Sequence, residues 1–181
     1  GSGWTLRIGY NNTSSTYLGQ MGAGWDGNWR GVNIVKIGTG TFVMSGANIL
    51  YNGTTTVDDG ALCFSNATAL ATSGITDNGT LIFDLSGGNS YTYGNVIGGV
   101  GALVKNGAGT LTLTANDTYS GQTTVNGGTL VLTGQISGGG PVQMNAGTTL
   151  RGTGTIAGPV TTASARLIPG TDGTAGTLTM G

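Results

Sequence analysis

Aspartate is the residue type of this 181-residue sequence that is best suited to catalysis, because the chain contains neither glutamate nor histidine. Asp58 and Asp59 are adjacent, and a pair of positioned carboxyl groups can cleave a glycosidic bond. The other interpretation is a turn, because the matching place in a second copy of the surrounding sequence reads Asn126-Gly127, and Asp, Asn and Gly replace one another in turns. We favour the turn. Asp84 and Asp117 each stand alone, at an expected strand edge or loop, so neither supplies the second carboxyl group.

The lysines and the cysteine are the remaining reactive side chains, and we expect them to be solvated or to fill space rather than to carry out chemistry. Lys36 and Lys105 occupy equal places in the two copies, and we expect both to be solvated charges that protect a strand from unwanted pairing. Cys63 is the single cysteine and is expected to be a small apolar filler. Without histidine, Ser-His-Asp catalysis, Cys-His catalysis and histidine-ligated metal sites are excluded within this chain. We therefore expect no enzyme activity, no cofactor and no metal.

Charge and hydropathy argue against two classes of partner. The net charge is −1 and the four arginines are scattered, so no basic stripe exists that could neutralise a nucleic-acid backbone. No apolar run reaches the length of a membrane span, and we expect no membrane insertion by this chain. Trp25 and Trp29 could stack on sugar rings, although a role in covering the first coil of the fold is the favoured interpretation.

Composition predicts which elements carry these side chains. The sequence has 38 glycines and only 3 prolines, and threonine is frequent throughout. Helix formers are scarce, since glutamate is absent and lysine occurs twice, so a helix would be costly almost everywhere. Apolar residues make up 37% of the chain, which is enough for a packed core. We predict an all-β protein.

A short signature of glycine, then threonine or alanine, then alternating apolar residues recurs along the chain. Most copies start 19 to 22 residues apart, which is the length of one coil of a β-solenoid. The eight-residue step from Gly101 to Gly109 is the exception, and it predicts two short strands around one corner. The clean copies begin at Gly40, Gly60, Gly79, Gly101, Gly109, Gly128 and Gly176.

A longer repeat lies over the short one. The sequence VKIGTGTFVMSGANILYNGTTTVDDGALCF from Val35 matches VKNGAGTLTLTANDTYSGQTTVNGGTLVL from Val104, with Gly46 as an extra residue in the first copy. Alternation with period two places one set of side chains inward and the threonines mostly outward. The inward ladder is predicted to contain Phe42, Met44, Val57, Leu62, Phe64, Leu81, Phe83, Leu111, Leu113, Val125, Leu130 and Leu132.

Both long copies resemble the passenger-associated repeat of autotransporter proteins, the type V secretion family. In that repeat, Lys-x-Gly-x-Gly-Thr-Leu leads to Asn-x-x-Tyr-x-Gly-x-Thr-x-Val and then Gly-x-Leu. The segment TTLRGTGTIAGPVTTASARLIPG at 148–170 is similar to one that commonly follows such repeats. The resemblance covers residues 31–181 and implies a right-handed parallel β-helix, extracellular or on a bacterial outer surface. Ala115 departs from the usual Ser-Gly step, and the sequence contains no membrane barrel, so the resemblance implies no self-transport by this chain.

We divide the sequence into two parts: residues 1–30, an aromatic, strand-like cap or inter-subunit connector, and the β-helix of residues 31–181. Because a solenoid has unpaired backbone groups at its ends, we expect head-to-tail stacking of copies into an extracellular filament. The alternatives are a stalk or adhesive fragment of a longer passenger that meets surface glycans or host and neighbouring cells, and a polysaccharide-binding or polysaccharide-cleaving β-helix. The expected contact between copies joins Trp4, Leu6, Ile8 and Tyr10 to Leu178 and Met180.

Overall fold

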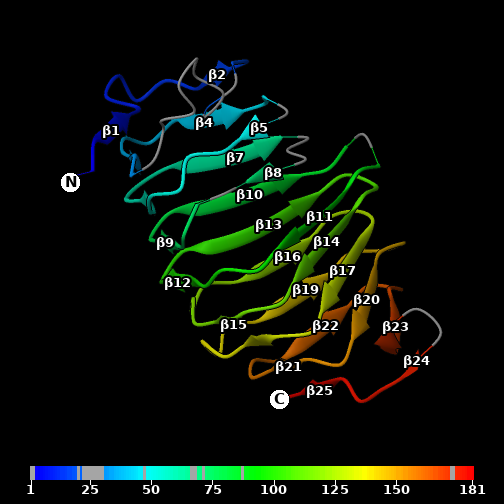
Figure 1. Ribbon diagram of the computed structural model, residues 1–181. Helices are drawn as coiled ribbons and strands as arrows, with labels where there is room; N and C mark the ends of the chain where they lie inside the picture. Colours follow the sequence, from blue (N-terminus) through cyan, green and yellow to red (C-terminus); the bar gives the residue numbers. More distant parts are fainter. Residues whose placement is uncertain are drawn as a thin grey trace.

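The protein is a stack of short parallel β-strands wound into a solenoid (Figure 1). The computed structural model describes residues 3–19, 21, 31–46, 48–65, 69–70, 72–86, 88–171 and 174–181. Every element within these residues is a strand, and each pair of strands runs parallel except β23 and β24. The predicted all-β solenoid is confirmed, and it follows from a sequence rich in threonine and glycine that disfavours helix.

The first side of the solenoid starts with a five-stranded sheet and continues with a four-stranded one. The Thr118 amide donates to the Ile97 carbonyl at 2.8 Å, which connects the two sheets. The strands are, in order, β1 (Thr5–Ile8), β3 (Asn33–Lys36), β6 (Thr55–Val57), β9 (Ile75–Asp77), β12 (Ile97–Gly99), and then β15 (Asn116–Asp117), β18 (Gln135–Ile136), β21 (Thr155–Ile156) and β25 (Thr179–Met180).

The second side is one continuous sheet of eight strands. These are β2 (Ser15–Tyr17), β4 (Thr41–Met44), β7 (Ala61–Ser65), β10 (Thr80–Asp84), β13 (Ala102–Asn106), β16 (Thr123–Val125), β19 (Val142–Met144) and β22 (Val160–Thr162).

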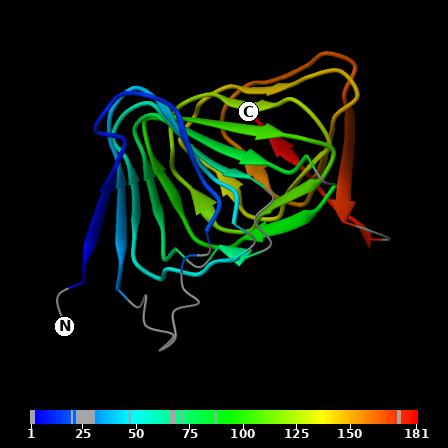
Figure 2. The same cartoon turned by 90° about the horizontal axis from the view of Figure 1, so that it is seen from above.

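The third side has a two-stranded sheet followed by a six-stranded sheet. Seen from above, the coils wind around one shared interior (Figure 2). The strands are β5 (Asn48–Ile49) and β8 (Ala69–Leu70), then β11 (Ser90–Tyr93), β14 (Thr110–Leu113), β17 (Thr129–Leu132), β20 (Thr149–Gly152), β23 (Arg166–Thr171) and β24 (Thr174–Ala175). From β3 to β23, the described strands therefore form seven coils of three strands each around one shared interior.

The predicted coil length holds for the inner coils only. In the strand pairs that lie entirely within β3 to β21, the paired residues of successive coils are 19 to 22 positions apart in the sequence. Examples are Leu62 with Leu81 and Leu81 with Leu103. The first coil is longer, since Leu6 pairs with Ile34. The solenoid thus has regular inner coils and irregular outer ones.

The two long repeats lie on different sides of the solenoid. The first begins in β3 on the first side, whereas the second begins in β13 on the second side. The step from Gly101 to Gly109 explains the difference, because β13 and β14 follow one another around a corner, as predicted. The same repeat therefore fits two different sides of the coil.

Residues 4–18 form the first coil of the same chain. β1 pairs with β3 and β2 pairs with β4, and β25 likewise pairs with β21. The pairing of this segment with another copy stays a prediction.

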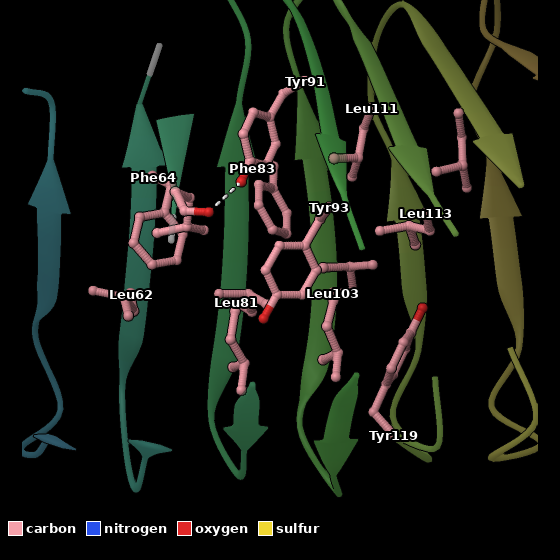
Figure 3. Packing of buried hydrophobic residues seen from close by; sticks show 14 of the residues in the cluster. Leu62, Phe64, Leu81, Phe83, Tyr91, Tyr93, Leu103, Leu111, Leu113 and Tyr119 are labelled. Carbon is pink, nitrogen blue, oxygen red and sulfur yellow. Dashed lines mark hydrogen bonds between the residues drawn. The ribbon is translucent and has the colours of Figure 1, made fainter. Parts of the chain in front are cut away.

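The interior is filled by aligned apolar side chains (Figure 3). Eleven of the twelve residues assigned to the inward ladder are at most 1% exposed, and Phe42 is half-buried against the same cluster. Leu111, Leu130 and Leu150 pair in register, so each leucine packs on its counterpart from the next coil. Alignment of like residues lets many coils share one core that no single coil could close.

Tyrosines Tyr91 and Tyr93 also enter this core, although the repeats give no sign of them. The Phe83 ring lies 5.9 Å from the Phe64 ring and 6.1 Å from each tyrosine ring, measured between centroids. The Tyr91 hydroxyl donates to the Leu70 carbonyl at 3.0 Å, which satisfies the polar end of a buried ring (Figure 3).

Candidate functional site

The adjacent aspartates form a turn. Asp58 and Asp59 are exposed and follow β6. One Asp59 carboxylate oxygen accepts a hydrogen bond from the Gly60 amide at 2.7 Å. Asp84 lies at the end of β10, where the Ser86 hydroxyl donates to its carboxylate. These contacts are typical of local turn bonding and bring no second carboxyl group into position for hydrolysis.

The expectation that the two lysines are solvated is wrong. Lys36 is 1% exposed and Lys105 is completely buried. The Lys36 ammonium donates to the carbonyls of Ile37 at 2.8 Å, Gly38 at 2.6 Å and Asp59 at 3.1 Å. Asp59 belongs to the following coil, so this side chain fastens one coil to the next inside a corner.

Lys105 repeats this arrangement at the corner between β13 and β14. Its ammonium donates to the carbonyls of Asn106 at 3.2 Å, Gly107 at 2.7 Å and Gly127 at 2.8 Å. Burial lowers the pKa of Lys105 to about 8, while the nearby Asp84 charge raises it. The three carbonyls favour the protonated form, because only the ammonium has three N–H groups to donate.

Glycine makes these lysine corners possible. Gly38 and Gly107 each follow the lysine by two positions and have φ angles of +71° and +79°. Residues other than glycine rarely adopt this backbone conformation. A Cβ at Gly107 would also lie 2.3 Å from the Leu85 carbonyl carbon. The Lys-x-Gly pattern in both repeats is therefore the signal that could have identified the corner, since it pairs a donor with a glycine that turns its carbonyl inward.

A second buried polar contact also recurs in both repeats. The Tyr51 hydroxyl lies 2.5 Å from the Thr55 hydroxyl, and the Tyr119 hydroxyl lies 2.6 Å from the Thr123 hydroxyl. All four side chains are at most 1% exposed. The Tyr-x-Gly-x-Thr spacing was visible in both repeats of the sequence, but the contact between the two hydroxyls was evident only in the structure.

Two buried carboxyl groups are the residues that sequence reasoning missed or misplaced. Asp77 is 1% exposed and accepts hydrogen bonds from the Gly79 and Leu81 amides at 3.1 and 3.2 Å. Burial raises its pKa to about 6, against the lowering effect of those two bonds. Asp117 was expected at a strand edge or loop; it is completely buried in β15, because its side chain faces the core.

The single cysteine offers no reactive thiol. Cys63 is 7% exposed, lies outside the core cluster, and points away from Leu62 and Phe64 by the alternation of β7. Burial raises the pKa of its thiol to about 11, which suppresses the nucleophilic thiolate. Its packing matches the expected role as an apolar filler.

The structure adds two observations about metals and membranes. Among the residues that it describes, no three Cys or Asp side chains gather closely enough to hold a metal ion. The described part of the chain also has no helix that could cross a membrane. Trp25 and Trp29, the candidate sugar-stacking residues, lie outside the described residues.

Comparison with known families assigns the two long repeats. Residues 34–62 and 103–132 match a family described as passenger-associated-transport-repeat. Two segments of the chain are therefore similar to passenger-associated-transport repeats. Each passenger repeat contains one lysine corner and one tyrosine–threonine contact, so the matched segments coincide with the recurring buried polar groups. The predicted resemblance to this family is confirmed.

A curated relative with similar passenger sequence is an adhesin, named BmaC autotransporter, from Brucella suis biovar 1 (strain 1330). The two sequences are 46% identical over 88 residues, which is 48% of this chain. The chain spans 3% of the length of that relative. No solved structure gives a significant match to the chain.

Proposed function

We propose that this chain is a non-enzymatic segment of a bacterial surface adhesin, a stiff solenoid that holds and forms part of an adhesive passenger. The observation that carries the proposal is the coincidence of two segments that match the passenger repeat with a β-solenoid that has one continuous eight-stranded sheet. The relative named as an adhesin supports the adhesive role. The location that follows is extracellular or on the outer surface, with glycans or the surfaces of neighbouring and host cells as partners.

Stiffness is the property that the geometry supports best. The eight-stranded sheet runs along the stack without interruption, and the lysine corners add hydrogen bonds between coils from inside the core. Buried hydrogen bonds of charged groups are stronger than those of neutral groups and are not exposed to competing water. Coils that are connected by a continuous sheet and by buried hydrogen bonds can transmit force along the axis of the solenoid.

The described residues also support a non-enzymatic role. The two exposed aspartates form a turn, and the two buried ones face the core, where no polysaccharide could reach them. The net charge of −1 and the absence of a basic stripe argue against a nucleic-acid partner.

Thiol labelling on intact bacteria tests the surface location. In cells that produce the full-length natural protein, Cys63→Ala removes the single thiol of this segment, and Thr92→Cys then places one on the exposed face of β11. A membrane-impermeant maleimide should label Thr92→Cys on intact cells. The matched control Val125→Cys lies in the core and should react only after denaturation. Labelling of Thr92→Cys only after cell lysis would refute the surface location.

A head-to-tail filament is a second candidate function, favoured by the apolar side chains of the first coil. Trp4, Tyr10 and Leu18 are 81%, 71% and 79% exposed, and the edge of β1 opposite β3 has no strand partner among the described residues. At the other end, Leu178 is buried within the chain, whereas Met180 is 42% exposed. An unpaired edge with apolar neighbours is suited to receive a strand from a second copy.

Electron microscopy of the purified chain separates the two candidates. The filament requires long fibres that disappear when residues 1–20 are deleted, because this deletion removes both first-coil strands. The adhesin segment requires no fibres, and light scattering should then report a monomer at high concentration. Fibres that survive the deletion would show that the first coil is not the connector.

A further inference from the structure

Asp117 has an unusual position for a carboxyl group. It is completely buried in β15, and one carboxyl oxygen accepts a hydrogen bond from the Ile97 amide of the preceding coil at 2.8 Å. The other oxygen, Oδ2, has no hydrogen-bond partner. An ionised carboxylate with one donor in an apolar core is costly, whereas the neutral acid has a much smaller desolvation cost.

The first passenger repeat shows that the fold does not require a carboxyl group there. The position equivalent to Asp117 is Ile49, which is also completely buried. An isoleucine therefore fills the equivalent place of the first repeat, and Ile136 fills the place in register with Asp117 in the following coil. Since an apolar side chain suffices for packing, the carboxyl group of the second repeat adds a property that packing alone does not need.

The groups that face Asp117 reinforce its isolation. In the neighbouring coils, Ile97 of β12 and Ile136 of β18 contribute apolar side chains. The buried hydroxyl of Tyr93 has no hydrogen-bond partner and interacts electrostatically with Asp117. Burial raises the pKa of the Tyr119 hydroxyl, and the charges of Asp117 and Asp77 raise this pKa further.

Within the described part of the chain, no cation acts on the Asp117 carboxyl group. The two buried ammonium groups among the described residues, Lys36 and Lys105, are engaged by backbone carbonyls at their own corners. The charge of Asp117 is opposed by burial and is supported only by the Ile97 amide.

We propose that Asp117 is a proton-binding site inside the solenoid, which is held as the neutral acid in the folded protein and whose ionisation weakens the stack between β12 and β15. The proton resides on Oδ2, the oxygen without a partner, while the other oxygen keeps the bond from Ile97. Loss of the proton leaves a charge among apolar side chains and the Tyr93 and Tyr119 hydroxyls. The contribution of Asp117 to stability is consequently largest in mild acid and is lost as the pH rises toward neutral.

Linkage fixes the sign of this effect. Burial raises the pKa of Asp117 from 3.8 to about 7. Between these values the folded chain binds one proton more than the unfolded chain, so the unfolding equilibrium constant rises about tenfold per pH unit. From pH 5 to pH 8 the contribution of this carboxyl group is about a hundredfold. Asp77 acts in the same direction, with a smaller effect because its pKa is about 6.

Carboxyl NMR on the purified chain tests the proposal directly. The ¹³Cγ resonance of Asp117 should titrate near neutral pH, whereas a midpoint near pH 4 would overturn the proposal.

Urea unfolding of Asp117→Asn gives an independent test. Between pH 5 and pH 8, the unfolding equilibrium constant of the wild type should rise about a hundredfold more than that of this variant. The matched control Asp58→Asn, an exposed residue that follows β6, should keep the full rise of the wild type. An equal rise in wild type and Asp117→Asn would contradict the proposal. Should Asp117→Asn fail to fold, Asp117→Ile provides the residue of the first repeat, and the same comparison applies.

Discussion

At the scale of single residues, the buried polar groups separate what a sequence can predict from what it cannot. Lys36 and Lys105 were predicted to be solvated charges that protect a strand from unwanted pairing. The structure buries both, since the corner itself turns three carbonyls toward each ammonium. Two of the three carbonyls belong to the corner that follows the lysine, and the third belongs to the next coil. The ammonium group therefore meets its hydrogen-bond partners only after the chain has folded.

Replacing a corner lysine should therefore be costly. Lys105→Met keeps most of the side-chain volume but leaves the half-buried carbonyls of Gly107 and Gly127 without their donor. We expect a loss of about 2–4 kcal/mol in the free energy of unfolding, measured by urea titration. The control Arg7→Met removes an exposed charge from β1 and should change stability by no more than about 0.5 kcal/mol. Equal effects of the two changes would show that the lysine corner contributes nothing.

The inward ladder gives a second comparison at this scale. Leu130 is completely buried and pairs with Leu111 and Leu150, so Leu130→Ala should cost about 2–5 kcal/mol. Thr112 lies on the outer face of β14, and Thr112→Ala should be nearly neutral. Denaturant titration of both variants checks the parity, and similar losses at the two positions would contradict it.

At the scale of strands and corners, the period-two pattern predicted which way side chains face, because alternation is a local property. It did not predict on which side of the solenoid each strand lies. Short strands such as β5 and β8 have only two residues and leave no pattern in the sequence, yet they decide how many strands complete a coil. The step from Gly101 to Gly109 predicted a corner, but the side of the solenoid on which each repeat begins could be seen only in the structure.

Glycine at the start of β17 gives a test of corner geometry. Gly128 has a φ angle of +67°, and a Cβ there would lie 2.3 Å from the Gly109 carbonyl oxygen of the preceding coil. Gly128→Ala should destabilise the chain by at least about 1–3 kcal/mol, through strain and the close contact. Gly74→Ala is the matched control, because its Cβ would meet nothing closer than 3.6 Å. Thermal unfolding of the two variants measures the difference, and equal melting temperatures would argue against a strained corner.

At the scale of the whole molecule, the solenoid is a stack in which each coil is stabilised by its neighbours. The inner coils share a register, a core and a continuous sheet, while the first coil leaves large apolar side chains exposed. The sequence predicted this architecture because repetition is the folding principle. It did not predict the contents of the interior, where Asp77, Asp117, Tyr91 and Tyr93 lie, because none of the four is part of the apolar ladder that the two repeats share.

Adhesion of bacteria that produce the full-length protein tests the central proposal most directly. An in-frame deletion of residues 31–181 should reduce the number of bacteria that adhere to host cells. Antibody binding to a tag elsewhere in the passenger should show that surface display is unchanged. Adhesion equal to that of the intact protein, with equal display, would contradict the proposal that this solenoid is a working part of an adhesin.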